Sequence, residues 1–281
     1  MIFTPDTYRK FLELCDRFHN YSYKNVMLIF SQNPDATKIA GGKAWKQQFN
    51  RNLIPGAKGI GILIPLMSKD YLEFRSVSVY DVSQTEGAAL SPSLDYDYKT
   101  LISCIREISD ASLVFGDASH SKCLSVKEDM TDEEMVEALF SELAGDDVSY
   151  ILCKHFGLKT STYRFEITEL DDATLKGIHT AASDLIRKIE WSYQNRLGIK
   201  NLSYFTFEEM MALNYCLEED DRYEFIQKMV RLHDNSESED IRDIVWSLIS
   251  KIELISDTQY EKLKEDKFSY KLSAFSNYTI E

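Results

Sequence analysis

The chain has 281 residues, of which 44% are hydrophobic and 12% aromatic, with only 11 Gly and 5 Pro. This composition is sufficient for a packed core and excludes a disordered or low-complexity protein. The formal net charge is −14, yet residues 1–69 hold ten Lys and Arg against four Asp and Glu, which leaves −20 for the remainder. The basic part can attract an anionic polymer that the acidic part repels. The alternative is an acidic protein with uneven surface charge.

The sequence indicates no signal peptide, no membrane-spanning segment and no disulfide framework. The start MIFTPDTYRK lacks the basic residues and apolar run of a signal peptide. The longest strongly apolar run, Ile60–Met67, is too short to span a bilayer. The five cysteines are scattered and never form a CxxC pair, which argues against a disulfide framework and a cysteine-based zinc site. We expect a cytoplasmic protein without membrane contact.

The first third of the chain predicts helices followed by a small sheet. Helical spacing of apolar residues extends over Thr7–Ser31, with a second helix starting at Tyr23. A short helix is predicted over Lys43–Gln48. The β-branched segments Gly59–Pro65 and Phe74–Val82 predict two antiparallel strands.

After a loose segment at Gly87–Thr100 the pattern becomes mostly helical. A helix is predicted over Tyr98–Ala111, and short strands within Leu113–Lys127. A capping box, Thr131-Asp-Glu-Glu134, opens a helix that is expected to reach Phe156 and stop at Gly157. Further helices are predicted around Leu175–Ile189, from the capping box Thr206–Glu209, and over Ile241–Ile255. These elements predict an α+β fold, with N-terminal helices on a small antiparallel sheet and a mostly helical C-terminal part.

Several N-terminal motifs follow one another in a fixed order: YSYKN, QNPDAT, Trp45, PGAKG and DVSQTEG. Over roughly residues 8–87 this order closely resembles the N-terminal domain of ArdC-type antirestriction proteins and their LtrC-like relatives. Those proteins are carried by plasmids, conjugative elements and phages. The resemblance implies a domain that binds single-stranded DNA.

The residue types of this region suit that role, because single strands are bound by cations along the backbone and aromatic rings against the bases. The stretch Gly41–Ile60 carries four positive charges and no negative one. An alternative exists for two of the residue types, since a Trp is often part of the core and an Asn often braces backbone. The candidate DNA-binding residues are Tyr21, Tyr23, Lys24, Asn25, Lys43, Trp45, Lys46, Arg51 and Lys58.

The same resemblance implies a C-terminal zincin-like metallopeptidase domain, whose HExxH helix carries two zinc-binding His and a Glu base. This sequence has no HExxH. In one alignment FSELAG takes its place, with Ser141 and Gly145 at the ligand positions. In the other, DDVSYILC corresponds to a later helix, with Asp146 near the third ligand. Both alignments lack the imidazoles, so we expect an inactivated zincin-like domain without a metal or other cofactor.

These inferences predict a non-catalytic counter-defence protein of a mobile genetic element or phage, of antirestriction or anti-CRISPR type. An ArdC-like DNA-binding domain is expected over residues 1–90, a degenerate metallopeptidase-like domain over 91–202 and a helical extension over 203–281. The acidic C-terminal part is expected to bind a host restriction enzyme or CRISPR effector. One alternative is a residual metallopeptidase that uses Glu142, Asp146 and either His120 or His155. The other is a protein-binding inhibitor with no DNA role.

Overall fold

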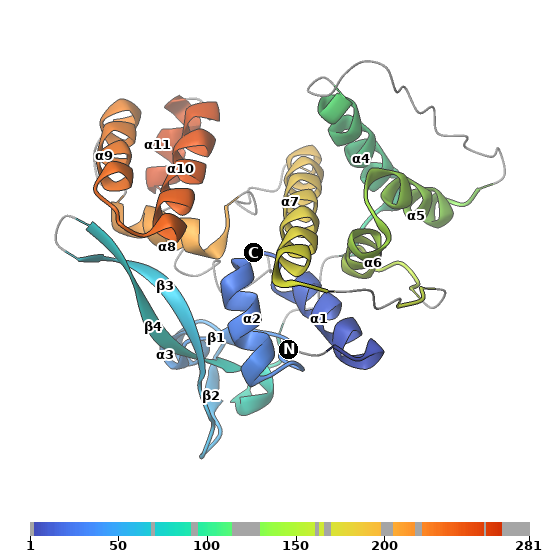
Figure 1. The fold of residues 1–281 in the computed structure, drawn as a ribbon, viewed down its shortest axis with the longest axis horizontal. Coiled ribbons are helices and arrows are strands. Elements are labelled where there is room, and N and C mark those ends of the chain that lie inside the picture. The colour runs from blue at the N-terminus through green and yellow to red at the C-terminus, as the bar shows by residue number, and fades with distance from the viewer. Residues whose placement is uncertain are drawn as a thin grey trace. The chain divides into compact units, whose positions relative to one another are not determined.

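The computed structural model describes residues 3–68, 71–90, 95–113, 130–160, 163–165, 170–197, 205–216, 221–255 and 257–265. The fold is α+β, as predicted, with a small antiparallel sheet and a mostly helical C-terminal part (Figure 1). The chain forms two compact units. The first unit comprises Met1–Tyr23 and Leu94–Tyr204, and the second comprises Lys24–Ser93 and Phe205–Glu281.

These units differ from the three consecutive domains expected from the sequence over residues 1–90, 91–202 and 203–281. The expected limits lie close to Ser93 and Tyr204, where the observed units exchange chain segments. However, the C-terminal helices belong to the same unit as the sheet. Helix α8 (Phe207–Cys216) packs on β3 (Ile60–Ser68), and α10 (Glu239–Leu254) contacts β4 (Tyr71–Asp81). A lone hairpin is marginally stable in water, so a helix cover of this kind is a physical requirement for the sheet.

The described secondary structure of the first unit is helical. Its helices are α1 (Pro5–Arg17), α4 (Tyr98–Leu113), α5 (Asp132–Leu143), α6 (Asp146–His155) and α7 (Asp172–Arg196). Helix α6 packs against α1, α5 and α7, and α4 packs against α5 and α7. Fully buried apolar residues such as Leu12, Ile151 and Ile186 line these contacts.

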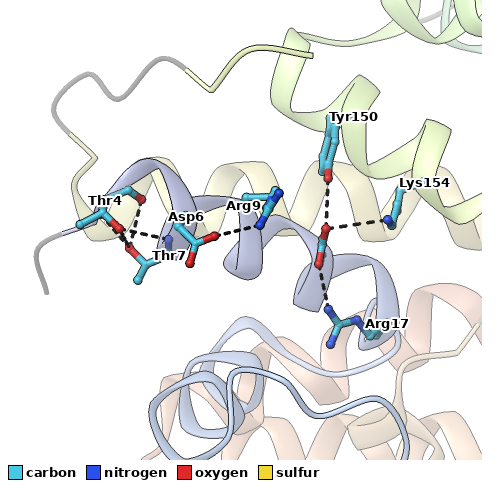
Figure 2. A network of polar contacts seen from close by, with 8 residues as sticks. Thr4, Asp6, Thr7, Arg9, Arg17, Tyr150 and Lys154 are labelled. Atoms are coloured by element: carbon cyan, nitrogen blue, oxygen red, sulfur yellow. Dashed lines mark hydrogen bonds and ion pairs between the residues drawn. The ribbon is translucent and has the colours of Figure 1, made fainter. Parts of the chain in front are cut away.

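A polar contact supports the packing of α1 against α6 (Figure 2). The Glu13 carboxylate accepts a hydrogen bond from the Tyr150 hydroxyl at 3.4 Å and lies 3.8 Å from Lys154 Nζ. Arg17, one turn further along α1, donates to the same carboxylate at 3.2 Å. At the start of α1, the Thr4 hydroxyl accepts from a backbone N–H of the first turn in a capping box. Both ends of α1 are therefore tied by side chains.

The prediction of one continuous helix from Thr131 to Phe156 is wrong, because this segment forms two helices, α5 and α6. Its capping box is confirmed, because the Glu134 N–H donates to Thr131 Oγ1 at 3.3 Å and the Glu134 carboxylate accepts from the Thr131 N–H at 2.8 Å. Helix α5 then ends, and Gly145, whose backbone is extended, forms the N-cap of α6. The expected stop is confirmed at Gly157, whose φ of +79° is the left-handed conformation that favours glycine. The strands expected within Leu113–Lys127 lie outside the described residues, apart from Leu113, which ends α4.

The second unit contains the sheet. Strand β4 (Tyr71–Asp81) lies between β1 (Ile39–Ala40) and β3 (Ile60–Ser68), and both pairings are antiparallel. The predicted strand pair is thus confirmed. A separate ladder joins β2 (Arg51–Leu53) to β5 (Thr85–Gly87), with the short 3₁₀ helix η1 (Val82–Gln84) before it.

The second unit also contains helices that precede, interrupt and follow these strands in the sequence. They are α2 (Tyr23–Gln32), α3 (Gly42–Gln47), α8, α9 (Arg222–Asp234), α10 and α11 (Asp257–Glu265). Helix α10 packs against α9 and α8. Within the described ranges, no helix combines the length and the apolar character needed to cross a membrane.

Glu209 joins the first turn of α8 to α10. Its side chain is buried, and its carboxylate accepts from the Thr206 N–H at 2.7 Å, which confirms the predicted capping box. The same carboxylate accepts from Ser247 Oγ and Lys251 Nζ, both at 2.6 Å. One buried charge therefore caps one helix and pairs with the next.

Replacing Glu209 with Ala is expected to lower the free energy of unfolding by about 3–5 kcal/mol, the usual cost of removing one partner of a buried ion pair. Urea unfolding followed by circular dichroism measures the change. The control is Glu253→Ala, an exposed position on α10, for which we expect a change within about 0.5 kcal/mol. Equal losses in the two variants would show that Glu209 has no special role.

Candidate nucleic-acid surface and a buried histidine cluster

Two aromatic candidates for base stacking lie in the core of their units. Trp45 is 1% exposed, its indole N–H donates to the Tyr80 carbonyl at 2.8 Å, and its ring packs on Phe49 with centroids 4.9 Å apart. Tyr21 is 7% exposed and packs edge-on against Phe18. The core role, one of two alternatives for Trp45, is the one that the structure shows. Neither ring presents a face to a base.

Asn25 braces backbone rather than facing solvent. Its side-chain amide accepts from the Leu63 N–H at 2.8 Å and donates to the Leu63 carbonyl at 2.7 Å, so it continues the edge of β3. It also donates to the buried Glu208 at 2.6 Å. The residue therefore holds α2 and α8 against the sheet.

The two remaining candidates at the start of α2 have acidic partners. The Tyr23 hydroxyl donates to Asp172 at 2.7 Å within the first unit. Lys24 pairs with Asp240 at 2.9 Å within the second unit. A phosphate at Lys24 must compete with that carboxylate, and the Tyr23 hydroxyl already donates to Asp172.

Arg51 connects β2 to β5. Its guanidinium donates to the Thr85 hydroxyl at 2.7 Å and the Thr85 carbonyl at 2.8 Å, and it also contacts the Ala88 carbonyl. These bonds occupy all three nitrogens of the side chain with the backbone and hydroxyl of its own unit. Arg51 therefore contributes to the stability of this ladder, and its hydrogen-bond acceptors are all neutral groups.

The three other lysines are exposed. Lys43 and Lys46 are three residues apart on α3 and so share one side of that helix. Lys58 lies in the connection between β2 and β3. In the part of the chain that the structure describes, none of the three forms an ion pair. Their charges are available to an anionic ligand.

The partly exposed Tyr80 lies beside Gly42 and Gly59, the chain neighbours of Lys43 and Lys58, and is not among the candidates predicted from sequence. A Cβ atom placed on Gly42 would be 3.8 Å from Cε2 of the Tyr80 ring, and one placed on Gly59 would be 3.6 Å from Cζ. The ring is thus flanked by the neighbours of Lys43 and Lys58. The only sequence signal was its position at the end of a Val-rich strand, directly before DVSQTEG. We call Lys43, Lys46, Lys58 and Tyr80 the lysine surface.

A different group is assembled in the first unit. His19 follows α1, His155 ends α6, and Glu190 lies on α7. One potential ligand atom of each residue lies within 4.8 Å of the others. Among residues with described positions, no other three His, Cys, Asp or Glu side chains meet in this way.

His155 is held between two carboxylates. Its Nδ1 is 2.8 Å from Asp16 Oδ1, and its Nε2 is 3.0 Å from Glu190 Oε1. Both nitrogens face acceptors, so both carry protons. Burial alone lowers the pKa of His155, but the hydrogen bonds to Asp16 and Glu190 outweigh it and raise the pKa well above 6.5. Burial alone raises the pKa of Glu190, but His155 lowers it below 4.5.

His19 is fully buried and has one unpartnered nitrogen. Its Nδ1 lies 2.7 Å from the Asp16 carbonyl oxygen and must donate to it. Its Nε2 has no hydrogen-bond partner and lies 3.8 Å from Glu190 Oε2. Burial, followed by the charge of His155, lowers the pKa of His19 below 6.5. The ring is therefore neutral, and the lone pair of Nε2 faces a carboxylate oxygen.

The residual metallopeptidase site suggested as an alternative from the sequence differs in its residues from this observed group. Glu142 and Asp146 are exposed, and neither belongs to the group that contains His155. His120 lies outside the described residues. The partners of His155 come instead from α1 and α7, at positions that no zincin motif marks.

Comparison of the chain with protein-family models, curated proteins and solved structures finds no match. The resemblance to ArdC-type proteins therefore rests on the sequence motifs alone.

Arg51→Gln is expected to lower the free energy of unfolding by about 1.5–3 kcal/mol, because it removes hydrogen bonds from a charged donor. Arg75→Gln is the control, since Arg75 is exposed and pairs with the nearby Glu73. Exposed ion pairs of that kind contribute at most about 1 kcal/mol. Urea unfolding compares the two. A loss for Arg51→Gln no greater than that of the control would contradict the bracing role.

The histidine cluster predicts a pH dependence of stability in protein freed of metal with a chelator. Because the pKa of His155 is higher in the folded chain than its ordinary 6.5, its contribution is complete below pH 6.5 and is lost as the pH rises above it. We expect a decline of up to about 1.4 kcal/mol per pH unit. In His155→Gln this decline should vanish, whereas His233→Gln, outside the cluster, should retain it. Identical profiles for wild type and His155→Gln would refute the assignment.

Proposed function

We propose that the protein is a non-catalytic counter-defence protein, of antirestriction or anti-CRISPR type, that binds single-stranded DNA through the lysine surface. The observation that carries this proposal is the exposure of Lys43, Lys46 and Lys58, two of which adjoin glycines that lie beside the Tyr80 ring. The three lysines belong to a stretch, 36–69, that contains no Asp or Glu. The ArdC-like order of motifs in the same region supports it.

The chemistry of the lysine surface suits a flexible anionic strand. Lysine ammonium groups bind phosphates of any sequence, and an aromatic ring stacks on any base. Tyr80 is the aromatic residue that these lysines flank, and Gly42 and Gly59 beside it have no side chain to cover the ring. A strand covered in this way is shielded from a defence nuclease. Single strands are favoured over duplex, because paired bases are not available for stacking on a side chain.

A second surface favours a protein partner. Trp246 on α10 is 58% exposed and Tyr223 on α9 is 71% exposed, in a region rich in Asp and Glu. Exposed large aromatics are enriched at protein interfaces. We propose that the acidic part, with a net charge of −20 outside residues 1–69, binds a basic host defence protein such as a restriction enzyme or CRISPR effector. The alternative function, a protein-binding inhibitor without a DNA role, relies on this surface alone.

Fluorescence anisotropy with labelled single-stranded and duplex oligonucleotides at two salt concentrations tests DNA binding. The triple variant Lys43→Glu, Lys46→Glu, Lys58→Glu is expected to weaken single-strand binding at least about tenfold. It should also reduce the slope of log K against log salt by roughly two, since each phosphate contact contributes about 0.7. The matched control reverses three exposed lysines of the first unit with the same change in net charge: Lys159, Lys176 and Lys188.

The control triple is expected to bind nearly as tightly as wild type. Equal weakening by both triples would show that overall charge, not the lysine surface, governs binding. Tyr80→Ala should weaken binding by about 1–3 kcal/mol without changing the salt slope, because stacking involves no counterion release. If the wild-type chain binds neither form of DNA, the protein-binding alternative replaces the proposal.

A further inference from the structure

We propose that His19, His155 and Glu190 form a binding site for a divalent transition-metal ion of the zinc type. All three belong to the first unit, so the site is formed within one compact part of the chain. It is separate from Ser141 and Gly145, which take the HExxH ligand positions in one of the two alignments, and from Asp146, which stands near the third ligand in the other. The inference does not depend on the proposed DNA binding.

The ligand types and their spacing suit zinc. Two imidazoles and one carboxylate are a known zinc ligand set that leaves a fourth position for water or another ligand. With bonds of about 2.0–2.2 Å, tetrahedral ligand atoms lie roughly 3.3–3.6 Å apart. Here the Nε2 atoms of His155 and His19 lie 3.0 Å and 3.8 Å from the oxygens of Glu190. These distances run to two different oxygens, Oε1 and Oε2, and one ligand atom of each residue lies within 4.8 Å of the others, so the side chains must shift to bring all three to bonded distances.

The partners of the two histidines fix the orientation of both rings. His155 Nδ1 bonds the Asp16 carboxylate, and His19 Nδ1 bonds the Asp16 backbone carbonyl. Metal-binding histidines commonly donate their second ring N–H to such groups, which fixes the other nitrogen toward the ion. A single residue, Asp16, thus directs both Nε2 atoms toward Glu190. The unpartnered Nε2 of the fully buried His19 is the feature that hydrogen bonds within the cluster leave unexplained.

The charge balance also favours a divalent ion. In the metal-free cluster, Asp16 and Glu190 are negative and the His155 imidazolium is positive, so a nearly buried group has one net negative charge. A divalent cation would replace the Nε2 proton of His155, which passes to solvent, and would leave the group neutral. It would also fill the space between His19 Nε2 and Glu190, where two acceptors now face each other without a donor.

Aromatic residues enclose this cluster and limit the movement of Glu190. The Tyr96 hydroxyl donates to Glu190 Oε1 at 2.9 Å. The Tyr96 ring packs against Phe156 and Tyr193, with centroids 4.8 Å and 5.1 Å apart. A preorganised carboxylate loses less conformational entropy on binding an ion. An ion held here would join α6, α7 and the end of α1, and so stabilise the first unit.

The test uses the full chain, stripped with a chelator and dialysed. Titration with Zn²⁺ by calorimetry, in competition with a chromogenic chelator, measures stoichiometry and affinity, and Co²⁺ reports tetrahedral coordination through its visible absorption. We expect one tight equivalent. His19→Gln and Glu190→Gln should each weaken binding by more than about 100-fold, and Asp16→Asn by about 10–100-fold, as for other residues that orient ligands. His233→Gln, outside the cluster, should bind as wild type does.

Circular dichroism establishes that each variant is folded, and a rise in melting temperature with Zn²⁺ gives a second readout. If His19→Gln fails to fold, Glu190→Gln and Asp16→Asn carry the test. The proposal is overturned if folded wild-type protein takes up neither Zn²⁺ nor Co²⁺, or if binding persists unchanged in the cluster variants. The triple lysine variant should bind metal normally, so failure of DNA binding and failure of metal binding are distinguishable.

Discussion

A buried imidazole between two carboxylates is the contact on which the first unit depends. His155, at the end of α6, bonds Asp16 near the end of α1 and Glu190 on α7. Because unpaired charges are costly in a protein interior, these three groups are stable only together. The arrangement also holds the unpaired nitrogen of His19 beside Glu190, so the contact that joins the helices is also part of the proposed cation site.

In the second unit, some residues of the basic stretch Gly41–Ile60 stabilise the fold, and others are exposed and available for binding. Trp45 and Arg51, which have the residue types expected to touch DNA, instead hold α3 beside β4 and β2 beside β5. Their buried or satisfied polar groups keep the intervening segments in place. Lys43 and Lys58 extend from those segments beside Tyr80. The bracing residues thus help to determine where the charges lie, and of the two only Trp45 is fully buried.

The two proposed activities make different demands on the chain. Binding of a single strand needs exposed charges and is weakened by salt, because counterions compete for the phosphates. Binding of a metal needs buried, preoriented ligands, and the surrounding protein excludes water from them. The lysine surface and the histidine cluster meet these demands in separate compact units. An ion at the proposed site would stabilise the first unit by binding the folded state and would need no catalytic zincin motif.

The sequence by itself determined the features that depend on neighbours in the chain: the α+β class, the strand pair before DVSQTEG, the capping boxes at Thr131 and Thr206, and the stop at Gly157. Each results from side chains within a few residues of one another. It did not show that α8 and α10 cover the sheet, that Trp45 is buried, or that His19 and His155 meet at Glu190. Only the tertiary structure decided these, because they depend on contacts between segments far apart in sequence, whose packing no local pattern encodes.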